Sequence, residues 1–407
     1  MREADLVVAE ARLLDTASMT YREPVDIAIA AGRVAEIRPA RPPRAGERRI
    51  SVGGRTVIPG LIDAHVHVIG TDGDYGRLAR TSPYLVAARA SRVLHDMLLR
   101  GFTTVRDAGG ADAGLKTAVA EGTLPGPRLF VCDLGLAQSG GQGDFRAEGE
   151  AEQGCPCCFG RRTLTRLVDG EAELRLAVRQ MLRAGADHVK VMASGGIASG
   201  IPIDRLQFSD AELATIVDEA RRAGTYVMAH AYMDEAIRRC VRLGVASIEH
   251  ASHLDDRTCQ AIAAAGATIV PTLSVYEAHA GDAGETGPLF AAMLDASLES
   301  LGRARAAGVA IGHGSDLTGG AHARQSREFL LKAEALRPDE VLRAATGTNA
   351  ALLGQAGALG VLAPGAFADL VALDGDPLEG AACLAEPERR FRLIVKGGTV
   401  YKNTLDD

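Results

Sequence analysis

The chain has 407 residues, of which 47% are hydrophobic and 24% charged, and its formal net charge is −7. Apolar and charged residues are interspersed along its whole length, which argues against an intrinsically disordered chain. No stretch of Lys and Arg is dense enough to follow a phosphate backbone, so we expect no nucleic-acid partner. The length allows two or three domains, or one α/β barrel with something smaller beside it.

The N-terminal segment has acidic residues where a signal peptide needs a basic start. No uncharged apolar run reaches the length of about 18 residues that a membrane span needs, so no membrane contact is expected. We therefore predict a cytoplasmic protein with reduced thiols. Cys155, Cys157 and Cys158 form a cluster with no second cysteine pair or histidine nearby, which favours a loop with unpaired thiols over a structural zinc site.

The two ends of the chain resemble each other and differ from the middle. Residues 4–38 and the residues from 364 onward contain short strand-like runs separated by turn residues. We predict that these ends meet in one discontinuous β-sandwich domain, made of residues 1–56 and 360–407. Residues 57–359 would form the second domain.

The middle of the chain alternates short apolar, β-branched runs with helical patterns. The runs are 56–68, 102–109, 128–136, 188–196, 226–232, 247–253, 267–273 and 309–316. Helical segments lie at 84–100, 171–184, 209–223, 233–243, 255–265 and 322–336, and Ser209 with Glu212 forms a capping box at the start of one of them. Eight strands alternating with helices predict the α/β class and a (β/α)8 TIM-like barrel, whose chemistry sits where the strands end.

Polar residues occur at those strand ends. They are His65 and His67 on the first run, Lys190 on the fourth, His230 on the fifth, His250 on the sixth and Asp316 on the eighth. Alternate strand residues share a face, so His65 and His67 would point together into the barrel mouth. Each residue alone has a structural explanation, such as a core histidine or a helix cap. Their common location instead favours a site for two divalent ions, with zinc the best match to imidazole and carboxylate ligands.

The motifs PGLIDAHVHV, GADHVKVMASGG, VMAHAY and IEH, followed by an Asp at the eighth strand, resemble the amidohydrolase superfamily over nearly the whole chain. The Lys with its MASGG segment is most similar to the branch of prolidase-like Xaa-Pro dipeptidases, related carboxypeptidases and ochratoxin-type amidases. The resemblance implies that His65, His67 and Asp316 hold one metal ion and that His230 and His250 hold the other. It also implies that Lys190 bridges the two as a carbamate formed with carbon dioxide or bicarbonate.

Elementary chemistry agrees with that assignment. A buried lysine has a lowered pKa, so its neutral amine can add carbon dioxide. Two divalent ions that share a water molecule make a bridging hydroxide near neutral pH. Asp316 would move its proton to the leaving nitrogen, while one metal ion polarises the carbonyl. We predict hydrolysis of an amide bond in a small molecule or dipeptide with a carboxylate, such as Xaa-Pro, an N-acyl amino acid or an ochratoxin-like amide.

Five further residues are considered for the site. Tyr232 resembles a tyrosine that binds a substrate carboxylate in the peptidase branch, although a packing aromatic is an equal alternative. Gln142 stands where relatives have the His of a GGHGD loop, which keeps hydrogen bonding but removes a titratable group. His313 precedes Asp316 by three residues, so we expect a supporting or core residue rather than a ligand. For Arg205 and Arg221, surface positions are favoured over carboxylate binding.

The sequence lacks the motifs of other classes of hydrolase. It has no G-x-S-x-G motif around a serine and no Gly-Lys pair for a phosphate loop. Two alternatives remain on the same metal centre, namely lactone or ester hydrolysis and deamination. A non-catalytic scaffold is the least favoured hypothesis, because such a protein should have lost ligands. Self-association into a homo-oligomer is compatible with a barrel of this kind.

Overall fold

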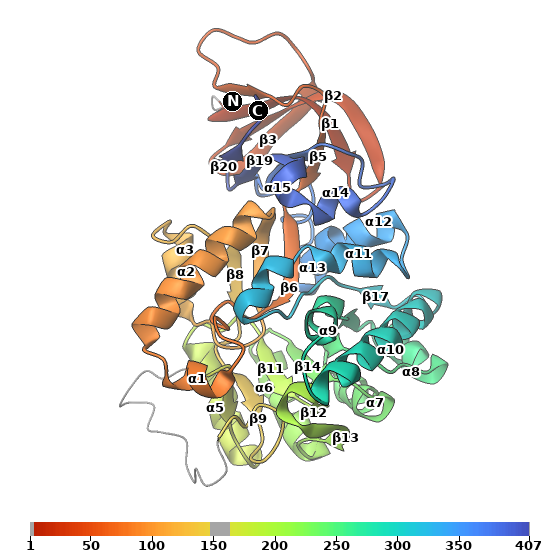
Figure 1. The fold of residues 1–407 in the computed structure, drawn as a ribbon. Helices are drawn as coiled ribbons and strands as arrows, with labels where there is room; N and C mark the ends of the chain where they lie inside the picture. Colours follow the sequence, from red (N-terminus) through yellow and green to blue (C-terminus); the bar gives the residue numbers. More distant parts are fainter. Residues whose placement is uncertain (1–3, 147–162, 407) are drawn as a thin grey trace.

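Strands from both ends of the chain meet in one sheet of the computed structural model, which describes residues 4–146 and 163–406. The eight strands are β1 (Leu6–Asp15), β2 (Thr20–Ala30), β3 (Arg33–Pro39), β4 (Arg49–Ser51), β5 (Thr56–Pro59), β18 (Leu370–Leu373), β19 (Phe391–Lys396) and β20 (Thr399–Asn403). Their order is β20-β19-β18-β5-β1-β2-β3, with β4 beside β1. The first and last described strands, β1 and β20, both belong to this terminal sheet (Figure 1). The three cysteines predicted to lie in a loop fall outside the described residues.

The two halves of the terminal sheet join where β5 pairs antiparallel with β18, with Pro59 opposite Leu370 and Thr56 opposite Leu373. Alternating apolar side chains from both ends fill a common core, among them Val8, Leu13, Ile27, Val57, Leu370 and Leu393. The two ends therefore share one sheet, whereas the predicted domain boundaries and the sandwich arrangement stay predictions.

The first predicted barrel strand, 56–68, is two strands. Residues 56–59 belong to the terminal sheet, and β6 (Leu61–Val66) pairs with β7 (Phe102–Asp107) instead. Gly60 separates them at a point of close contact, because a Cβ on Gly60 would lie 2.0 Å from Thr103 Oγ1. The continuous apolar run concealed this change of sheet, since both strands are fully buried.

Two parallel sheets form the larger part of the molecule. One contains β6, β7 and β8 (Arg128–Val131). The other has the order β10 (Thr165–Leu167), β9 (Gly135–Ala137), β11 (Val189–Met192), β14 (Val227–Ala231), β15 (Ser247–His250), β16 (Thr268–Val270) and β17 (Ala310–Ile311). A hairpin of β12 (Ser194–Gly196) and β13 (Ile201–Leu206) follows β11. The predicted runs 128–136 and 188–196 therefore each contain two strands.

Hydrogen bonds connect the two parallel sheets at both sides. Ala64 N donates to His313 O at 2.8 Å, and Asp187 N donates to Val131 O at 2.7 Å. Through the bond between Ala64 and His313, the segment after β17 runs beside β6, although β17 has only two residues. Asn349 closes the same junction, because its Nδ2 lies 2.8 Å from both Ile62 O and His313 O while its Oδ1 accepts from His313 N at 3.1 Å.

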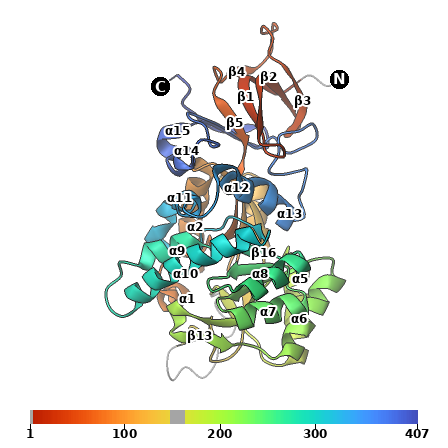
Figure 2. The same cartoon turned by 90° about the vertical axis from the view of Figure 1, so that its right-hand side faces the viewer.

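Helices cover the parallel sheets. They are α1 (Tyr75–Arg80), α2 (Pro83–Leu99), α3 (Ala113–Ala120), α5 (Glu171–Arg183), α6 (Asp210–Arg222), α7 (Asp234–Leu243), α8 (Asp256–Ala265), α9 (Leu273–His279), α10 (Thr286–Ala306), α11 (Arg327–Ala333), α12 (Pro338–Arg343) and α13 (Asn349–Leu352). The short helices α14 (Ala382–Ala385) and α15 (Pro387–Arg390) lie against the terminal sheet (Figures 1 and 2).

Helices α5, α6, α7 and α8 stand side by side along one flank (Figure 2). They match the predicted segments between 171 and 265, and the Ser209–Glu212 capping box is present at the start of α6. The predicted helix 322–336 is instead a 3₁₀ helix (Gly319–Arg324) followed by α11. Within the two described ranges, no helix combines the length and apolar character needed to cross a membrane.

Candidate metal centre and active site

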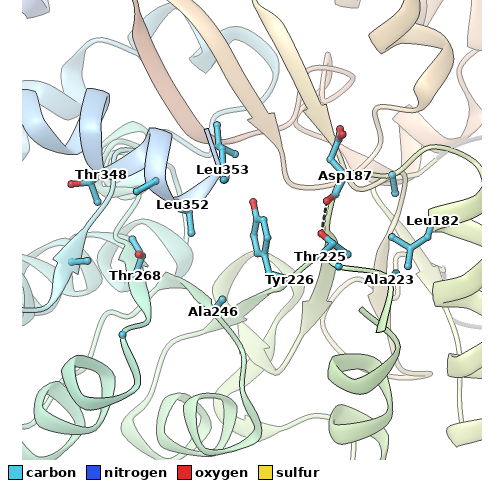
Figure 3. Close-up of a pocket in the computed structure, with 16 residues that line it drawn as sticks. Leu182, Asp187, Ala223, Thr225, Tyr226, Ala246, Thr268, Thr348, Leu352 and Leu353 are labelled. Atoms are coloured by element: carbon cyan, nitrogen blue, oxygen red, sulfur yellow. Dashed lines mark hydrogen bonds between the residues drawn. The ribbon is translucent and has the colours of Figure 1, made fainter. Parts of the chain in front are cut away.

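The parallel sheets carry a cavity at each end, and the two cavities differ in chemistry. A cavity of about 1080 Å³ lies where the strands begin, around Tyr226, Ala246 and Thr268, and no histidine lines it (Figure 3). A cavity of about 530 Å³ lies where the strands end. Its walls include all eight residues predicted for the site, namely His65, His67, Gln142, Lys190, His230, Tyr232, His250 and Asp316. The second cavity is therefore the candidate active site.

Asp316 lies between the two histidines of the first strand. Its Oδ1 is 3.3 Å from Nε2 of His65 and 3.3 Å from Nε2 of His67. Its Oδ2 is 4.0 Å from Nδ1 of His250. Ligand atoms of His65, His250 and Asp316 all lie within 4.8 Å of one another, a spacing that one metal ion can bridge.

Two further groups complete the wall. The ring of His230 lies 4.6 Å from that of His250, measured between centroids. Lys190 lies on β11 with 1% of its surface exposed, and its flanking residues Val189 and Val191 are fully buried, as predicted. Burial lowers the pKa of the Lys190 amine, against the opposing effect of Glu249 and Asp316. Burial likewise lowers the pKa of His230 to about 3, which leaves a neutral imidazole.

Each of the four histidines has one ring nitrogen engaged by a neighbouring group. Nδ1 of His67 lies 2.9 Å from the carbonyl oxygen of Gly109, and Nε2 of His230 lies 3.0 Å from that of Gly195. Nδ1 of His250 lies 2.8 Å from Thr272 Oγ1, and Nδ1 of His65 lies 2.7 Å from Glu249 Oε2. Such outer contacts fix the orientation of metal-binding histidines and leave the other nitrogen for the ion.

The protonation pattern around Asp316 calls for a cation. A carbonyl oxygen only accepts, so His67 must carry its proton on Nδ1 and present a lone pair at Nε2. The ionised Glu249 imposes the same pattern on His65. When both imidazoles are neutral, two lone pairs face one carboxylate oxygen of Asp316 at 3.3 Å. A positive ion between them removes this repulsion, and imidazole with carboxylate suits zinc, so these residues fit a divalent metal.

The pKa values agree with a site that favours positive charge. Burial lowers the pKa of His65, yet Asp316 and Glu249 raise it above its ordinary value overall. Burial also acts to raise the pKa of Glu249, but Arg106 and His65 bring it down to about 2. Burial also acts to raise the pKa of Asp316, but His65 and His67 lower it overall, so Glu249 and Asp316 are ionised at neutral pH.

The backbone is strained where the ligands occur. His250, Ala251, Thr272 and Asp316 have φ values of 74°, 50°, 50° and 53°, in the left-handed region that residues other than glycine rarely adopt. Each such residue costs on the order of 1–3 kcal/mol, which the surrounding structure must offset.

Buried carboxylates that the sequence analysis did not identify hold the ligand strand. Asp63 accepts hydrogen bonds from His65 N at 3.0 Å and from Ser315 Oγ at 2.6 Å. Asp107 accepts from Val68 N at 2.8 Å. Asp63 is visible in the motif GLIDAHVH, but nothing in that motif shows that its partners include Ser315, 252 positions away. Glu249, in the motif IEH, was also missed as the partner of His65.

The two predicted substrate residues both line the cavity. Tyr232 stacks on His250 with ring centroids 5.0 Å apart and packs in an apolar cluster with Tyr276 and Phe290. Burial, together with Tyr276, raises the pKa of the Tyr232 hydroxyl, which stays protonated. Gln142 is 9% exposed, and its buried Oε1 has no hydrogen-bond partner among the residues the structure describes. That oxygen is an acceptor available to a ligand.

The remaining candidates lie elsewhere. The ring of His313 packs against Phe102 and Phe329, with centroids 5.6 and 4.4 Å away, so it is a core residue and not a ligand, as predicted. Arg205 on β13 and Arg221 on α6 are exposed, and Arg221 pairs with Asp218 at 3.1 Å. Neither arginine lines the cavity.

Comparison with known proteins gives consistent results. The family model of the amidohydrolase family matches residues 56–402. Ochratoxinase of Aspergillus niger is 32% identical over 364 residues, covering 85% of this chain and 75% of that enzyme. A prolidase crystallised with N-methylphosphonate-L-proline is 43% identical with a TM-score of 0.93, covering 98% of this chain and 99% of its own. A Xaa-Pro dipeptidase structure with bound methionine is 26% identical with a TM-score of 0.87, covering 98% and 100%.

Proposed function

Because this chain belongs to the amidohydrolase family, we propose that it is a metal-dependent hydrolase of a peptide-type C–N bond. The preferred substrate would be a dipeptide such as Xaa-Pro or an N-acyl amino acid, including ochratoxin-like amides. One observation carries the proposal, namely the convergence of four histidines, Asp316 and Lys190 on a single cavity at the strand ends. The names of the relatives, a prolidase, a dipeptidase and an ochratoxinase, support the choice of bond.

We assign His65, His67 and Asp316 to one metal ion, His230 and His250 to a second, and a carbamate of Lys190 to both. When bound, two divalent ions, most simply zinc, would lower the pKa of a water molecule toward neutrality and polarise the scissile carbonyl. Asp316 would take the proton of the attacking water on a carboxylate oxygen and deliver it to the leaving nitrogen. The neutral form of the buried Lys190 amine would add carbon dioxide and release one proton, which leaves an anionic carbamate.

Substrate binding follows from the cavity walls. A volume of about 530 Å³ is in the usual range for a small-molecule site, which suits a dipeptide. The protonated Tyr232 hydroxyl would donate to the substrate carboxylate, and Gln142 Oε1 would accept from a substrate N–H. The apolar cluster of Tyr276, Phe290 and Met293 behind Tyr232 would exclude water from that side.

The same proposal includes the architecture. The parallel sheets, joined by hydrogen bonds at both sides, would form one closed (β/α)8 barrel, with a β-sandwich made from both termini beside it. The barrel would contribute every metal ligand. This arrangement explains why residues as distant in sequence as His65 and Asp316 lie in contact.

The decisive test combines metal analysis with a substrate panel. Purified protein should contain or take up two divalent ions per chain, and zinc with bicarbonate should activate it toward Xaa-Pro dipeptides, other dipeptides, N-acyl amino acids or ochratoxin-like amides. Protein without bound metal that added zinc and bicarbonate do not activate would refute the proposal. Turnover confined to lactones, esters or deamination substrates would instead establish the alternative reactions on this centre.

Lys190 has its own test. Protein prepared in ¹³C-bicarbonate should show a carbamate carbon signal by NMR, and Lys190→Met should remove it along with the second equivalent of metal. Lys116→Met is the matched control, because Lys116 is a half-exposed surface lysine paired with Asp187 at 2.5 Å. A signal that persists in Lys190→Met would show that the carbamate lies elsewhere.

A further inference from the structure

A fully buried ion pair lies beneath the candidate metal centre, inside the parallel sheets. Arg106 on β7 and Glu249 on β15 have no exposed surface, and Arg106 Nη2 lies 3.0 Å from Glu249 Oε1. Neither residue lines the cavity at the strand ends. The pair therefore touches no substrate, and its role must act through neighbouring residues.

The contacts of Arg106 fix it in one position. Its Nε donates to Ala64 O on β6 at 2.6 Å, and its Nη2 also lies 3.1 Å from Ser247 Oγ on β15. The bond to Ala64 stays within the three-stranded sheet, whereas the contact with Ser247 crosses to the seven-stranded sheet. Ser247 Oγ also donates to Glu249 Oε1. One carboxylate oxygen of Glu249 is thus held by two donors.

The other oxygen, Oε2, accepts from Nδ1 of His65 at 2.7 Å. This is where His65 differs from His67, whose Nδ1 is held by a main-chain carbonyl. A main-chain carbonyl cannot rotate away or gain a proton at ordinary pH. A side-chain acceptor such as Glu249 orients the histidine only if other groups fix the position of the acceptor. Arg106 and Ser247 supply that restraint.

We propose that Glu249 is a positioning residue for the metal centre, which Arg106 locks in place so that His65 keeps its proton on Nδ1 and turns Nε2 toward Asp316. The proposal rests on the proposed function to the extent that His65 binds a metal ion. Without the carboxylate, the other neutral tautomer would place a proton on Nε2, where it would hydrogen-bond to Asp316 and oppose metal binding.

The competing explanation is a core ion pair that only stabilises the fold. Breaking a buried pair by removing one partner destabilises a protein, whereas replacing both partners by apolar residues of similar size is often neutral. The double variant Glu249→Leu with Arg106→Met therefore separates the two roles. It removes both charges but also removes the acceptor for His65.

The experiment measures zinc affinity of metal-stripped protein by competition with a chromophoric chelator, and unfolding of the metal-free protein by urea with circular dichroism. The Leu/Met double variant loses the donor to Ala64 O, so its urea midpoint should fall, but it should remain folded without urea. It should bind zinc about 10–100-fold more weakly, the range found when outer partners of metal ligands are lost. Wild-type zinc affinity in this folded variant would overturn the proposal. Wild-type protein that binds no zinc would instead refute the proposed function.

Glutamine variants add a sharper prediction. In Glu249→Gln, Arg106 still donates to the amide oxygen, so the NH₂ group of the glutamine faces His65. This NH₂ group donates to Nδ1 of His65, which then carries its proton on Nε2, and zinc affinity should fall. Adding Arg106→Met frees the amide to turn its oxygen to His65, and affinity should recover relative to Leu/Met. This comparison also decides the question if the Leu/Met variant fails to fold, because a Glu249→Gln protein with unchanged affinity would overturn the proposal.

Tyr226→Phe is the matched control. The Tyr226 hydroxyl lies 3.4 Å from Arg106 Nη1, away from Glu249, and its ring borders the cavity at the opposite end of the sheets (Figure 3). This variant should leave zinc affinity unchanged. A loss in Tyr226→Phe equal to that in Glu249→Gln would show that any change around Arg106 acts on the site, and would overturn a specific role for Glu249.

Discussion

Asn349 is expected to be essential to the stability of the junction between β6 and the segment that carries Asp316. Its side chain is fully buried and makes three hydrogen bonds, to Ile62 O, His313 O and His313 N. Asn349→Ala removes all three. His313 O keeps Ala64 N as a donor at 2.8 Å, so the larger losses fall on the other two groups.

The expected loss can be estimated from these contacts. Each hydrogen bond contributes about 1 kcal/mol, and a buried group left without a partner costs about 1–3 kcal/mol. One lost bond at His313 O and two groups left without a partner predict that Asn349→Ala lowers the free energy of unfolding by about 3–7 kcal/mol. Thr346→Ala is the matched control, because the buried Thr346 hydroxyl makes its shortest contact, 2.7 Å, with Leu342 O in its own helix. It should cost about 1 kcal/mol.

The measurement is urea unfolding of metal-free protein followed by far-ultraviolet circular dichroism, since the chain contains no tryptophan. Asn349→Asp sharpens the test, because it places a carboxylate oxygen against two carbonyl oxygens. Its pKa should rise, so this variant should be more stable relative to wild type at pH 5 than at pH 8. A loss below about 1 kcal/mol for Asn349→Ala would refute the idea that this side chain replaces missing strand pairing.

Two further substitutions test the packing and the electrostatics around the site. A Cβ on Gly314 would lie 2.4 Å from Val270 Cγ1 and 2.7 Å from His65 Cβ, so Gly314→Ala should cost about 1–3 kcal/mol and weaken zinc binding. Gly320→Ala, where nothing lies within 4 Å, should change neither in the same urea and chelator assays. Burial lowers the pKa of His322 to about 4, so the unfolded chain binds more protons below pH 6.5. Acidification from pH 6.5 to 4 should therefore lower the free energy of unfolding by about 3 kcal/mol through this residue. In His322→Gln, the free energy of unfolding measured in urea should depend less steeply on pH than in the wild type. An equal dependence on pH in the two proteins would contradict this prediction.

The sequence could predict which residues come together in the cavity at the strand ends, because their signal is local. His65 and His67 lie two positions apart on one strand, and the other predicted ligands also come at strand ends, where an unexplained polar residue is conspicuous. Ser209 and Glu212 likewise reveal a helix start through a spacing of three. The same is true of His313, whose distance from Asp316 was enough to exclude it as a ligand.

What the sequence could not predict depends on partners far apart in the chain. Glu249 is a single charged residue in a strand, and its hydrogen bonds to Arg106 and His65 span 143 and 184 positions. Asn349 follows helical residues and gives no sign that it bridges strands. The division of residues 56–68 was hidden because one apolar run serves two sheets, and only the contact between Gly60 and Thr103 marks the change.

The pairing of β5 with β18 has a consequence for synthesis of the protein. Strands β1 to β5 leave the ribosome before β18, and the edge of β5 receives its partner only after more than 300 further residues have been made. Until then it presents unpaired backbone groups, the kind of edge that invites association with other chains. Folding of the terminal sheet must therefore be among the last events, and chaperones that shield a nascent sheet edge should raise the yield of native protein.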